Sequence, residues 1–346
     1  MGVIEKYAEL LPVTDKTPRI TLGEGSTPLV HLDRISREMD IDLWGKLEGC
    51  NPSGSFKDRG MVMAVAKALE SGAKALVCAS TGNTSASAAA YAAAAQIPCF
   101  VLLPAGNVDL GKLAQALMYG SKVIAVKGNF DRALEMAREA ADTKGFAIVN
   151  SVNPYRLWGQ RSGAWEVCDV LGSAPDWHAI PVGNAGNISA YWAGYRQYEE
   201  MGKIKALPRM MGFQAAGAAP LVTGEPCPMP ETVATAIRIG NPVSAHLAKD
   251  AVRGSGGEFN SVTDEEILSA QYYLSSKGGI FAEPASCAPL AGLLKLKRQG
   301  RLPKDIKVVM VLTGNGLKDP DTAMSQVGRP IEIGDSLDEL LEVMKG

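Results

Sequence analysis

Short runs of apolar, often β-branched residues alternate along the chain with longer segments of helical periodicity. This alternation is typical of parallel strands that are joined by crossover helices. The run Val308–Leu312 is apolar at every position, which suits a strand in a sheet that is covered on both faces. The pattern therefore predicts an α/β protein whose sheets are mostly parallel and flanked by helices.

The expected strands share this apolar character and are Leu43–Leu47, Ala75–Ala79, Cys99–Leu103, Lys122–Val126, Ala147–Asn150, Ala179–Val182, Met210–Gln214 and Lys307–Thr313. The expected helices fill most of the gaps and are Phe56–Leu69, Ser85–Ala95, Leu110–Tyr119, Arg132–Thr143, Tyr155–Leu171, Asn187–Met201, Asp264–Ser276, Ala285–Gln299 and Leu337–Lys345. The Gly- and Pro-rich stretch 215–243 predicts a long loop around a broken helix at a mouth or an interface. The glycine cluster Arg253–Gly257 predicts a turn.

Length and composition indicate the class of protein. A chain of 346 residues can bury a large core and is expected to form two lobes. The net charge of −2 and the lack of a dense Lys/Arg run disfavour nucleic acid and acidic membrane as partners. No apolar run approaches the ~20 residues of a membrane span, and no export signal is visible, so no membrane partner is expected.

Cysteine and histidine usage favours a cytoplasmic protein without a metal centre. The six cysteines are widely spaced and form no C-x-x-C pair, which favours free thiols in a reducing compartment. The histidines His31, His178 and His246 show no metal-ligand spacing, and each is interpreted as structural. No metal is expected, and a histidine-based catalytic triad is disfavoured.

The segment Asn51–Gly60 (NPSGSFKDRG) places one lysine between a polar turn and an apolar helix. Ser53 or Ser55 can cap the first amides of that helix. Lys57 then lies in the first turn, where the positive end of the helix dipole disfavours an ammonium and lowers its pKa. A neutral amine is the nucleophile that condenses with an aldehyde. The alternative is a surface lysine that pairs with Asp58.

Further polar blocks follow predicted strands, where ligands collect in an open α/β sheet. Residues 80–85 (STGNTS) offer hydroxyls and free helix amides that bind an anion or simply cap the helix. The turn Gly183–Asn187 (GNAGN) lets the backbone approach a phosphate, although such a turn alone is a weak signal. Thr313 provides a hydroxyl at a strand end that can contact a ligand; the alternative is a purely structural role. Arg156 can grip an anion with its guanidinium or can lie at the surface.

These blocks, in this order, resemble the fold-type II pyridoxal-phosphate enzymes. NPSGSFKDRG, together with residues 22–29 (LGEGSTPL), resembles the threonine synthase family most closely, and the similarity spans nearly the whole chain. The resemblance implies a tryptophan synthase β-like fold of two lobes, each with a mostly parallel sheet flanked by helices. The smaller lobe would comprise residues 49–146 and the larger lobe residues 1–48 plus 147–346, with the active site in the cleft between them.

The resemblance also implies roles for individual residues. Lys57 would be the catalytic lysine that binds the cofactor, pyridoxal 5'-phosphate, covalently. The other cofactor-binding residues would be Asn83 at the ring 3′-oxygen, Thr313 near the ring nitrogen, and the phosphate turn of Gly183, Asn184, Ala185, Gly186 and Asn187. The substrate-binding residues would be Ser80, Thr81, Thr84, Asn150, Ser151 and Arg156. Residues 159–162 read GQRS where the family commonly has Gly-Gln-Lys-Thr, which leaves the role of Arg161 open, and Glu283 receives no firm role.

The activity implied by the resemblance is the conversion of O-phospho-L-homoserine and water to L-threonine and phosphate, by a homodimer in the cytoplasm. A serine/threonine dehydratase or another β-replacing lyase is the alternative, which residues 82–87 (GNTSAS) disfavour because those enzymes usually have a GNHAQ-like block. A dinucleotide-dependent oxidoreductase would need a G-x-G-x-x-G turn after a strand, and the chain has none. A non-catalytic ligand-binding protein is the remaining hypothesis.

Overall fold

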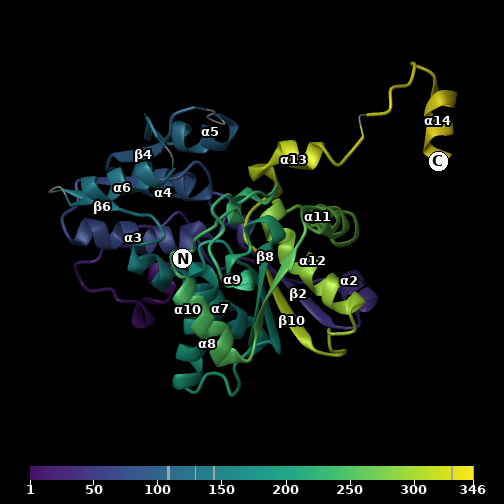
Figure 1. Cartoon of the computed structure of the whole chain (residues 1–346), viewed down its shortest axis with the longest axis horizontal. Coiled ribbons are helices and arrows are strands. Elements are labelled where there is room, and N and C mark those ends of the chain that lie inside the picture. Colours follow the sequence, from purple (N-terminus) through teal and green to yellow (C-terminus); the bar gives the residue numbers. More distant parts are fainter. Residues whose placement is uncertain (107–109, 129, 143–144, 329, 346) are drawn as a thin grey trace.

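The structure is a computed structural model of residues 1–346 that describes all of them except 107–109, 129, 143–144, 329 and 346. Two separate sheets organise the chain, and helices flank each of them (Figure 1). All strand pairs are parallel except that of the edge strand β1 (Leu29–His31) with its neighbour. The predicted α/β class with mostly parallel sheets is confirmed.

The smaller sheet has the strand order β5-β4-β3-β6. Its strands are β3 (Ala75–Ala79), β4 (Cys99–Pro104), β5 (Lys122–Val126) and β6 (Phe146–Ile148). The helices around it are α3 (Lys57–Glu70), α4 (Asn83–Ala94), α5 (Leu110–Met118) and α6 (Phe130–Ala141). Because β6 pairs with β3, this sheet extends to Ile148 and so beyond residue 146.

The larger sheet has the strand order β1-β2-β10-β7-β8-β9. Besides β1, its strands are β2 (Asp42–Leu47), β7 (Trp177–Pro181), β8 (Arg209–Ala215), β9 (Glu258–Val262) and β10 (Lys307–Leu312). Successive residues of β10 pack into two different hydrophobic cores. Val309 and Val311 pack in the core that includes residues of α7 (Pro154–Leu171) and α8 (Gly186–Glu200). Val308 and Met310 pack with residues of α11 (Asp264–Gly278) and α12 (Pro284–Arg298), which explains why β10 is apolar at consecutive positions.

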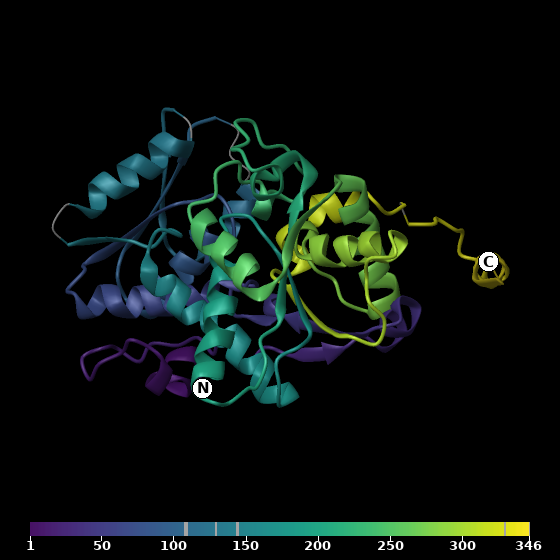
Figure 2. The same ribbon diagram turned by 60° about the horizontal axis from the view of Figure 1, so that its bottom comes forward.

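The other helices are α1 (Val3–Lys6), α2 (Asp33–Met39), α9 (Pro220–Thr223), α10 (Ala245–Ser255), α13 (Pro320–Met324) and α14 (Leu337–Lys345). The short 3-10 turns are η1 (Ala8–Leu10), η2 (Glu48–Cys50), η3 (Ala216–Ala218), η4 (Thr235–Ile237) and η5 (Gly316–Lys318). Figures 1 and 2 both show α14 at the end of an extended segment, away from the rest of the protein. Within the described residues, no helix is both long and apolar enough to span a membrane. In the same part of the chain, no cluster of His, Cys, Asp or Glu side chains could hold a metal ion.

Every expected strand and helix is present; β3, β5 and α14 have the predicted bounds, and the others have shifted ends. The expected helix end at Thr143 lies outside the described residues. The sequence missed β9 because it is a partly polar edge strand that pairs with β8 alone. It also missed β1, α1, α2, α10 and α13. The turn predicted at Arg253–Gly257 is wrong for its first residues, because α10 continues to Ser255 and ends at the left-handed Gly256. The loop 215–243 contains the short segments η3, α9 and η4, as a broken helix would.

Candidate active site

One pocket is lined by residues that follow strands of both sheets. Asn83 follows β3 of the smaller sheet, whereas Gly183–Asn187 follows β7 and Thr313 follows β10 of the larger sheet. Lys57 and Arg156, near the N-termini of α3 and α7, add two cationic side chains to the lining. Ligands collect at the carboxyl ends of parallel strands, so this is the expected location of an active site.

Lys57 is the first residue of α3, and its Nζ lies 4.1 Å from the centre of the Phe56 ring. Burial in the pocket and the positive charge of Arg156 lower the pKa of this amine to about 7, while the carboxylate of Glu283 opposes the shift. The sequence predicted the direction of this shift and attributed it to the helix dipole, whereas burial is its main cause. A substantial neutral fraction of the amine is therefore present at neutral pH.

The turn before α3 is held by Asp58. Its carboxylate accepts the backbone N–H of Ser53 at 2.7 Å and the hydroxyl of Ser53 at 2.6 Å. It also accepts the hydroxyl of Ser87 in α4 at 2.6 Å, so Asp58 joins the two helices and is not an ion-pair partner of Lys57. Of the two serines predicted to cap the helix, Ser55 does so with a long bond, because its hydroxyl oxygen accepts the N–H of Lys57, the first residue of α3, at 3.4 Å.

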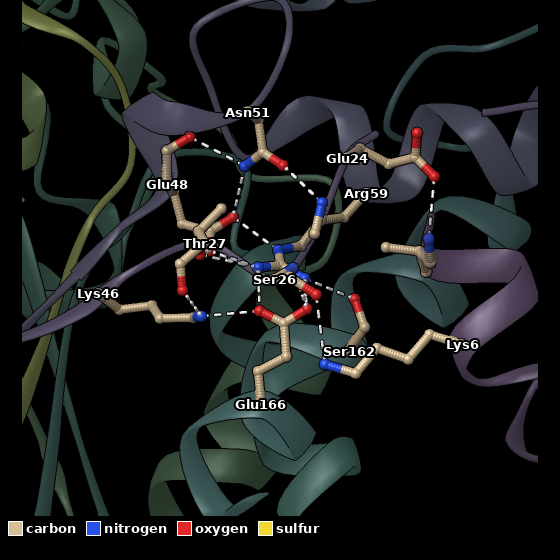
Figure 3. A network of polar contacts seen from close by, with 12 residues as sticks. Lys6, Glu24, Ser26, Thr27, Lys46, Glu48, Asn51, Arg59, Ser162 and Glu166 are labelled. Atoms are coloured by element: carbon tan, nitrogen blue, oxygen red, sulfur yellow. Dashed lines mark hydrogen bonds and ion pairs between the residues drawn. The ribbon is translucent and has the colours of Figure 1, made fainter. Parts of the chain in front are cut away.

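Arg59 anchors the same turn of α3 in a network of buried charges (Figure 3). Its guanidinium donates to both carboxylate oxygens of Glu48, at 2.7 and 2.8 Å. It also donates to both carboxylate oxygens of Glu166, at 2.8 and 2.7 Å. Lys46 donates to Glu166 at 2.7 Å. These side chains come from β2, η2, α3 and α7, so the network fixes the start of the helix that carries Lys57 against β2 and α7.

The charges of this network balance within it. Burial acts to raise the pKa of the Glu166 carboxyl, but Arg59 and Lys46 outweigh it and hold that pKa below its usual value. Removal of one member would leave an uncompensated buried charge, at a cost of about 3–5 kcal/mol. The network also binds residues of the LGEGSTPL block. The Ser26 N–H donates to Glu166 at 2.7 Å, and Lys46 donates to the Thr27 carbonyl at 2.6 Å, although neither Ser26 nor Thr27 lines the pocket.

The turn Gly183–Asn187 has the geometry of an anion cradle. Ala185 adopts a left-handed conformation with φ 66°, and α8 begins directly after it, with first amides that have no partner inside the helix. A Cβ on Gly183 would lie 3.0 Å from the Cα of Ile237, so a side chain has no room there. Both polar side-chain atoms of Asn187 are buried without a partner. Free amides and an unsatisfied carboxamide at a helix N-terminus suit a phosphate.

Arg156 brings a second anion-binding group to the pocket. Its side chain is 2% exposed; one terminal nitrogen donates to the Val149 carbonyl at 3.3 Å, and Nε has no partner. Burial lowers the pKa of the guanidinium to about 10, so it stays charged at neutral pH. Ser151 lies in the same lining. A buried and under-satisfied cation beside a hydroxyl is a receptor for an anionic group of a ligand.

Two polar residues of the lining, Glu283 and Gln160, had no role assigned from the sequence. Asn83 Nδ2 donates to both carboxylate oxygens of Glu283, at 3.1 and 3.0 Å, which joins the start of α4, beside the smaller sheet, to the start of α12. Burial raises the pKa of the Glu283 carboxyl, while the bond from Asn83 opposes this shift. Gln160 lies one turn beyond Arg156 on α7, and its buried Oε1 has no partner. The i, i+4 spacing from Arg156 was the sequence signal for Gln160.

Thr313 ends the apolar strand β10 inside the pocket and is 4% exposed. Its hydroxyl lies 2.9 Å from that of Ser286, which also accepts the Gly314 N–H at 2.9 Å. A neutral hydroxyl donates or accepts a hydrogen bond, but it does not stabilise a proton on a ring nitrogen as a carboxylate would.

Some of the predicted site residues lie outside the pocket lining. Ser80 and Thr81 lie in the turn between β3 and α4, and Thr84 lies in the first turn of α4, but none of the three lines the pocket in the structure. Asn150 does not line it either, and its side chain is bonded to Ala79, whose N–H it accepts at 2.9 Å and to whose carbonyl it donates at 2.8 Å. Asn150 thus secures the end of β3, and substrate contacts from these residues stay predictions.

Known proteins are similar to this chain over most of its length. The model of the family described as "Pyridoxal-phosphate dependent enzyme" matches residues 20–314. Threonine synthase of Halalkalibacterium halodurans is 54% identical over 100% of this chain and 98% of that protein. Threonine synthase of Mycobacterium tuberculosis is 56% identical over 94% of this chain and 91% of that protein. The chain belongs to the threonine synthase family of pyridoxal-phosphate-dependent enzymes.

Solved structures show the same fold at low sequence identity. Maize serine racemase has a TM-score of 0.76 at 19% identity, over 99% of this chain and 98% of that chain. O-ureido-L-serine synthase has a TM-score of 0.76 at 21% identity, over 96% of this chain and 100% of that chain. The chain therefore has the fold-type II architecture, and its cofactor is pyridoxal 5'-phosphate. The residues present fit this group: an amine for its aldehyde at Lys57 and a glycine cradle for its phosphate at Gly183–Asn187.

Proposed function

We propose that this enzyme converts O-phospho-L-homoserine and water to L-threonine and inorganic phosphate, the last step of threonine biosynthesis. The proposal rests on the meeting of the Lys57 amine, with its lowered pKa, and the under-satisfied Arg156 guanidinium in one pocket. The amine would bind the aldehyde of the cofactor, and the guanidinium would bind a phosphate on the substrate. The identity of 54–56% to threonine synthases over nearly the whole chain supports the same substrate.

Pyridoxal phosphate, when bound, supplies an aldehyde for covalent attachment and a ring that stores electrons from the bonds broken beside it. Lys57 Nζ would hold the aldehyde carbon, and the turn Gly183–Asn187 would bind the cofactor phosphate through its free amides. Asn83 would donate to the 3′-oxygen of the ring. Thr313 would bond to the ring nitrogen through its hydroxyl, without a carboxylate to keep that nitrogen protonated.

Lys57 would also move protons during the reaction. A pKa of about 7 lets its amine take up and release a proton at neutral pH, which is the condition for efficient general acid–base catalysis. The reaction needs such a group, because the α and β carbons of the substrate lose protons before phosphate leaves the γ carbon. The γ carbon then gains a proton, the β carbon gains the hydroxyl of a water molecule, and the α carbon regains its proton. When the substrate amine takes the place of Lys57 Nζ, the freed Lys57 amine would remain in the pocket, near these carbons.

Arg156 and Ser151 would hold the phosphate of the substrate. Their place in the lining supports this role, as does the free Nε of Arg156. Thr84, Ser80 and Thr81 would add contacts from the turn after β3. Asn150 would hold the end of β3, and its bonds to the Ala79 backbone support this role. It would also contact the phosphate of the substrate.

The two-lobe organisation is also part of this proposal. Residues 49–146 would form one lobe and residues 1–48 plus 147–346 the other, with the pocket in the cleft between them. The presence of two separate sheets supports this division, with β6 as the strand at the border. The enzyme would act as a homodimer in the cytoplasm, in line with its six unpaired cysteines.

Two measurements test the proposal. Purified protein is expected to release phosphate from O-phospho-L-homoserine and to form an equal amount of threonine. Preferential release of a keto acid from threonine would instead support a serine/threonine dehydratase. Borohydride reduction of the yellow protein, followed by peptide mapping, is expected to label Lys57, and a label on another peptide would overturn its role.

A further inference from the structure

The segment Pro330–Lys345 lies outside the body of the protein, and we call it the C-terminal arm. It begins beyond α13 as an extended chain and ends in the helix α14, which Figures 1 and 2 show apart from all other elements. Every residue of the arm is exposed, and α14 has no buried residue. The arm therefore finds no packing partner within its own copy of the chain.

The arm has the sequence of a helix that packs against another surface. Leu337, Leu340, Leu341 and Met344 recur at i, i+3, i+4 and i+7 and form one apolar face. These side chains are 67%, 42%, 42% and 72% exposed. A helix of 9 residues is marginal by itself in water, because so few hydrogen bonds do not offset the cost of nucleation. Its persistence thus requires that the apolar face be covered.

The arm and the rest of the chain carry opposite net charges. From residue 330 to residue 346 the sequence has five carboxylates and one lysine, which gives a net charge of −4. Because the whole chain has a net charge of −2, the remainder carries +2. The acidic arm is therefore attracted to the body of a second copy of the same chain.

A surface of matching chemistry lies at the edge of the smaller sheet. Leu117 and Met118, at the end of α5, are 45% and 85% exposed. Ile124 on the edge strand β5 is 44% exposed, and Lys122 and Lys127 are exposed at the start of this strand and just beyond its end. Exposed apolar side chains with lysines near them in the chain are the chemistry that an acidic amphipathic helix binds.

We propose that the C-terminal arm of one copy docks on the body of a second copy and buries the apolar face of α14 there. In a two-fold dimer each copy both gives and receives an arm, so each dimer makes this contact twice. The inference rests on the homodimer of the proposed function and identifies an element that stabilises it. None of the arm residues lines the active-site pocket.

Crosslinking with two isotopes tests which copy receives the arm. The full chain is prepared with a photoreactive amino acid at position 343, beside the apolar face, in ¹⁴N and ¹⁵N forms. The two forms are unfolded and refolded together with cofactor and then irradiated. Crosslinked peptides that join a ¹⁴N arm to a ¹⁵N body, and the reverse, are expected. Crosslinks between peptides of the same isotope alone would show that the arm folds onto its own copy, and would overturn the proposal.

Sedimentation equilibrium of the holoenzyme measures what the arm contributes. The double variant Leu340→Asp, Leu341→Asp is expected to raise the Kd of the dimer at least about tenfold, the change that a loss of about 1.4 kcal/mol produces. The matched control Leu340→Met, Leu341→Met keeps the face apolar and should keep the Kd of the unchanged protein. A double aspartate variant with an unchanged Kd would refute the role of the arm, while phosphate release separately reports on the proposed function. A monomeric unchanged protein would refute both the arm exchange and the homodimer.

Discussion

The substitution Arg156→Gln removes the cation that we propose for the substrate phosphate. The guanidinium bonds to the protein through one terminal nitrogen and the Val149 carbonyl at 3.3 Å, so little of the effect should come from lost protein contacts. Loss of a hydrogen bond to a charged group costs about 1.5–3 kcal/mol. Since about 1.4 kcal/mol is a factor of ten, kcat/KM for O-phospho-L-homoserine should fall by about 10- to 150-fold.

The matched control is Arg161→Gln, which removes the same charge from the same helix. Arg161 lies 3.6 Å over the Trp158 ring and does not line the pocket, so its loss should leave kcat/KM nearly unchanged. Phosphate release gives kcat/KM, and competition by inorganic phosphate should weaken by a similar factor in the Arg156 variant alone. Unchanged kcat/KM and phosphate inhibition in Arg156→Gln, or an equal loss in both variants, would refute the assigned phosphate site.

Three other predictions follow from the charges around the pocket. The cofactor-free protein should take up pyridoxal phosphate more slowly below about pH 7, because the Lys57 amine is then protonated. Stopped-flow absorbance measures this rate of uptake, and a rate that does not change with pH across neutrality would contradict the prediction. Glu283→Gln removes the carboxylate that raises the pKa of Lys57, so the same uptake profile should move to lower pH, and a move to higher pH would count against the contact. Glu166→Gln removes the carboxylate that pairs with Lys46 and one of the two that pair with Arg59. It leaves one buried positive charge uncompensated and should lower the free energy of unfolding in urea by about 3–5 kcal/mol, whereas Glu200→Gln, in an exposed pair, should change it little.

The alternation of strands and helices could be predicted because its signal is local. The apolar run of β10 and the alanine-rich sequence of α4 can each be recognised within a short stretch of chain. The strand β9 could not be predicted in the same way, since its partly polar residues become a strand only by pairing with β8. The end of α10 was misread because a Gly-Ser-Gly run predicts a turn unless packing extends the helix through it.

The site residues also differ in whether the local sequence indicates them. Lys57, the turn Gly183–Asn187 and Arg156 stand in short blocks whose spacing indicated their positions, and the structure brings all of them to one pocket. Glu283 had no such signal, because its partner Asn83 lies 200 positions away in the sequence. Burial and long-range contact are properties of the folded chain and leave no local trace in the sequence.

The sequence by itself determined the parallel α/β class, since this follows from the local pattern of apolar residues. It also predicted an aldehyde-binding amine at Lys57 and a phosphate turn at Gly183–Asn187, through the order of the blocks and their resemblance to a known family. Only the tertiary structure decided that the Lys57 amine has a pKa of about 7, because the cause is desolvation in the pocket and the charge of Arg156 from another helix. It also decided that Arg59 is neutralised by Glu48 and Glu166, which come from different elements. Electrostatic effects depend on distance in space and on exclusion of water, and folding alone sets both.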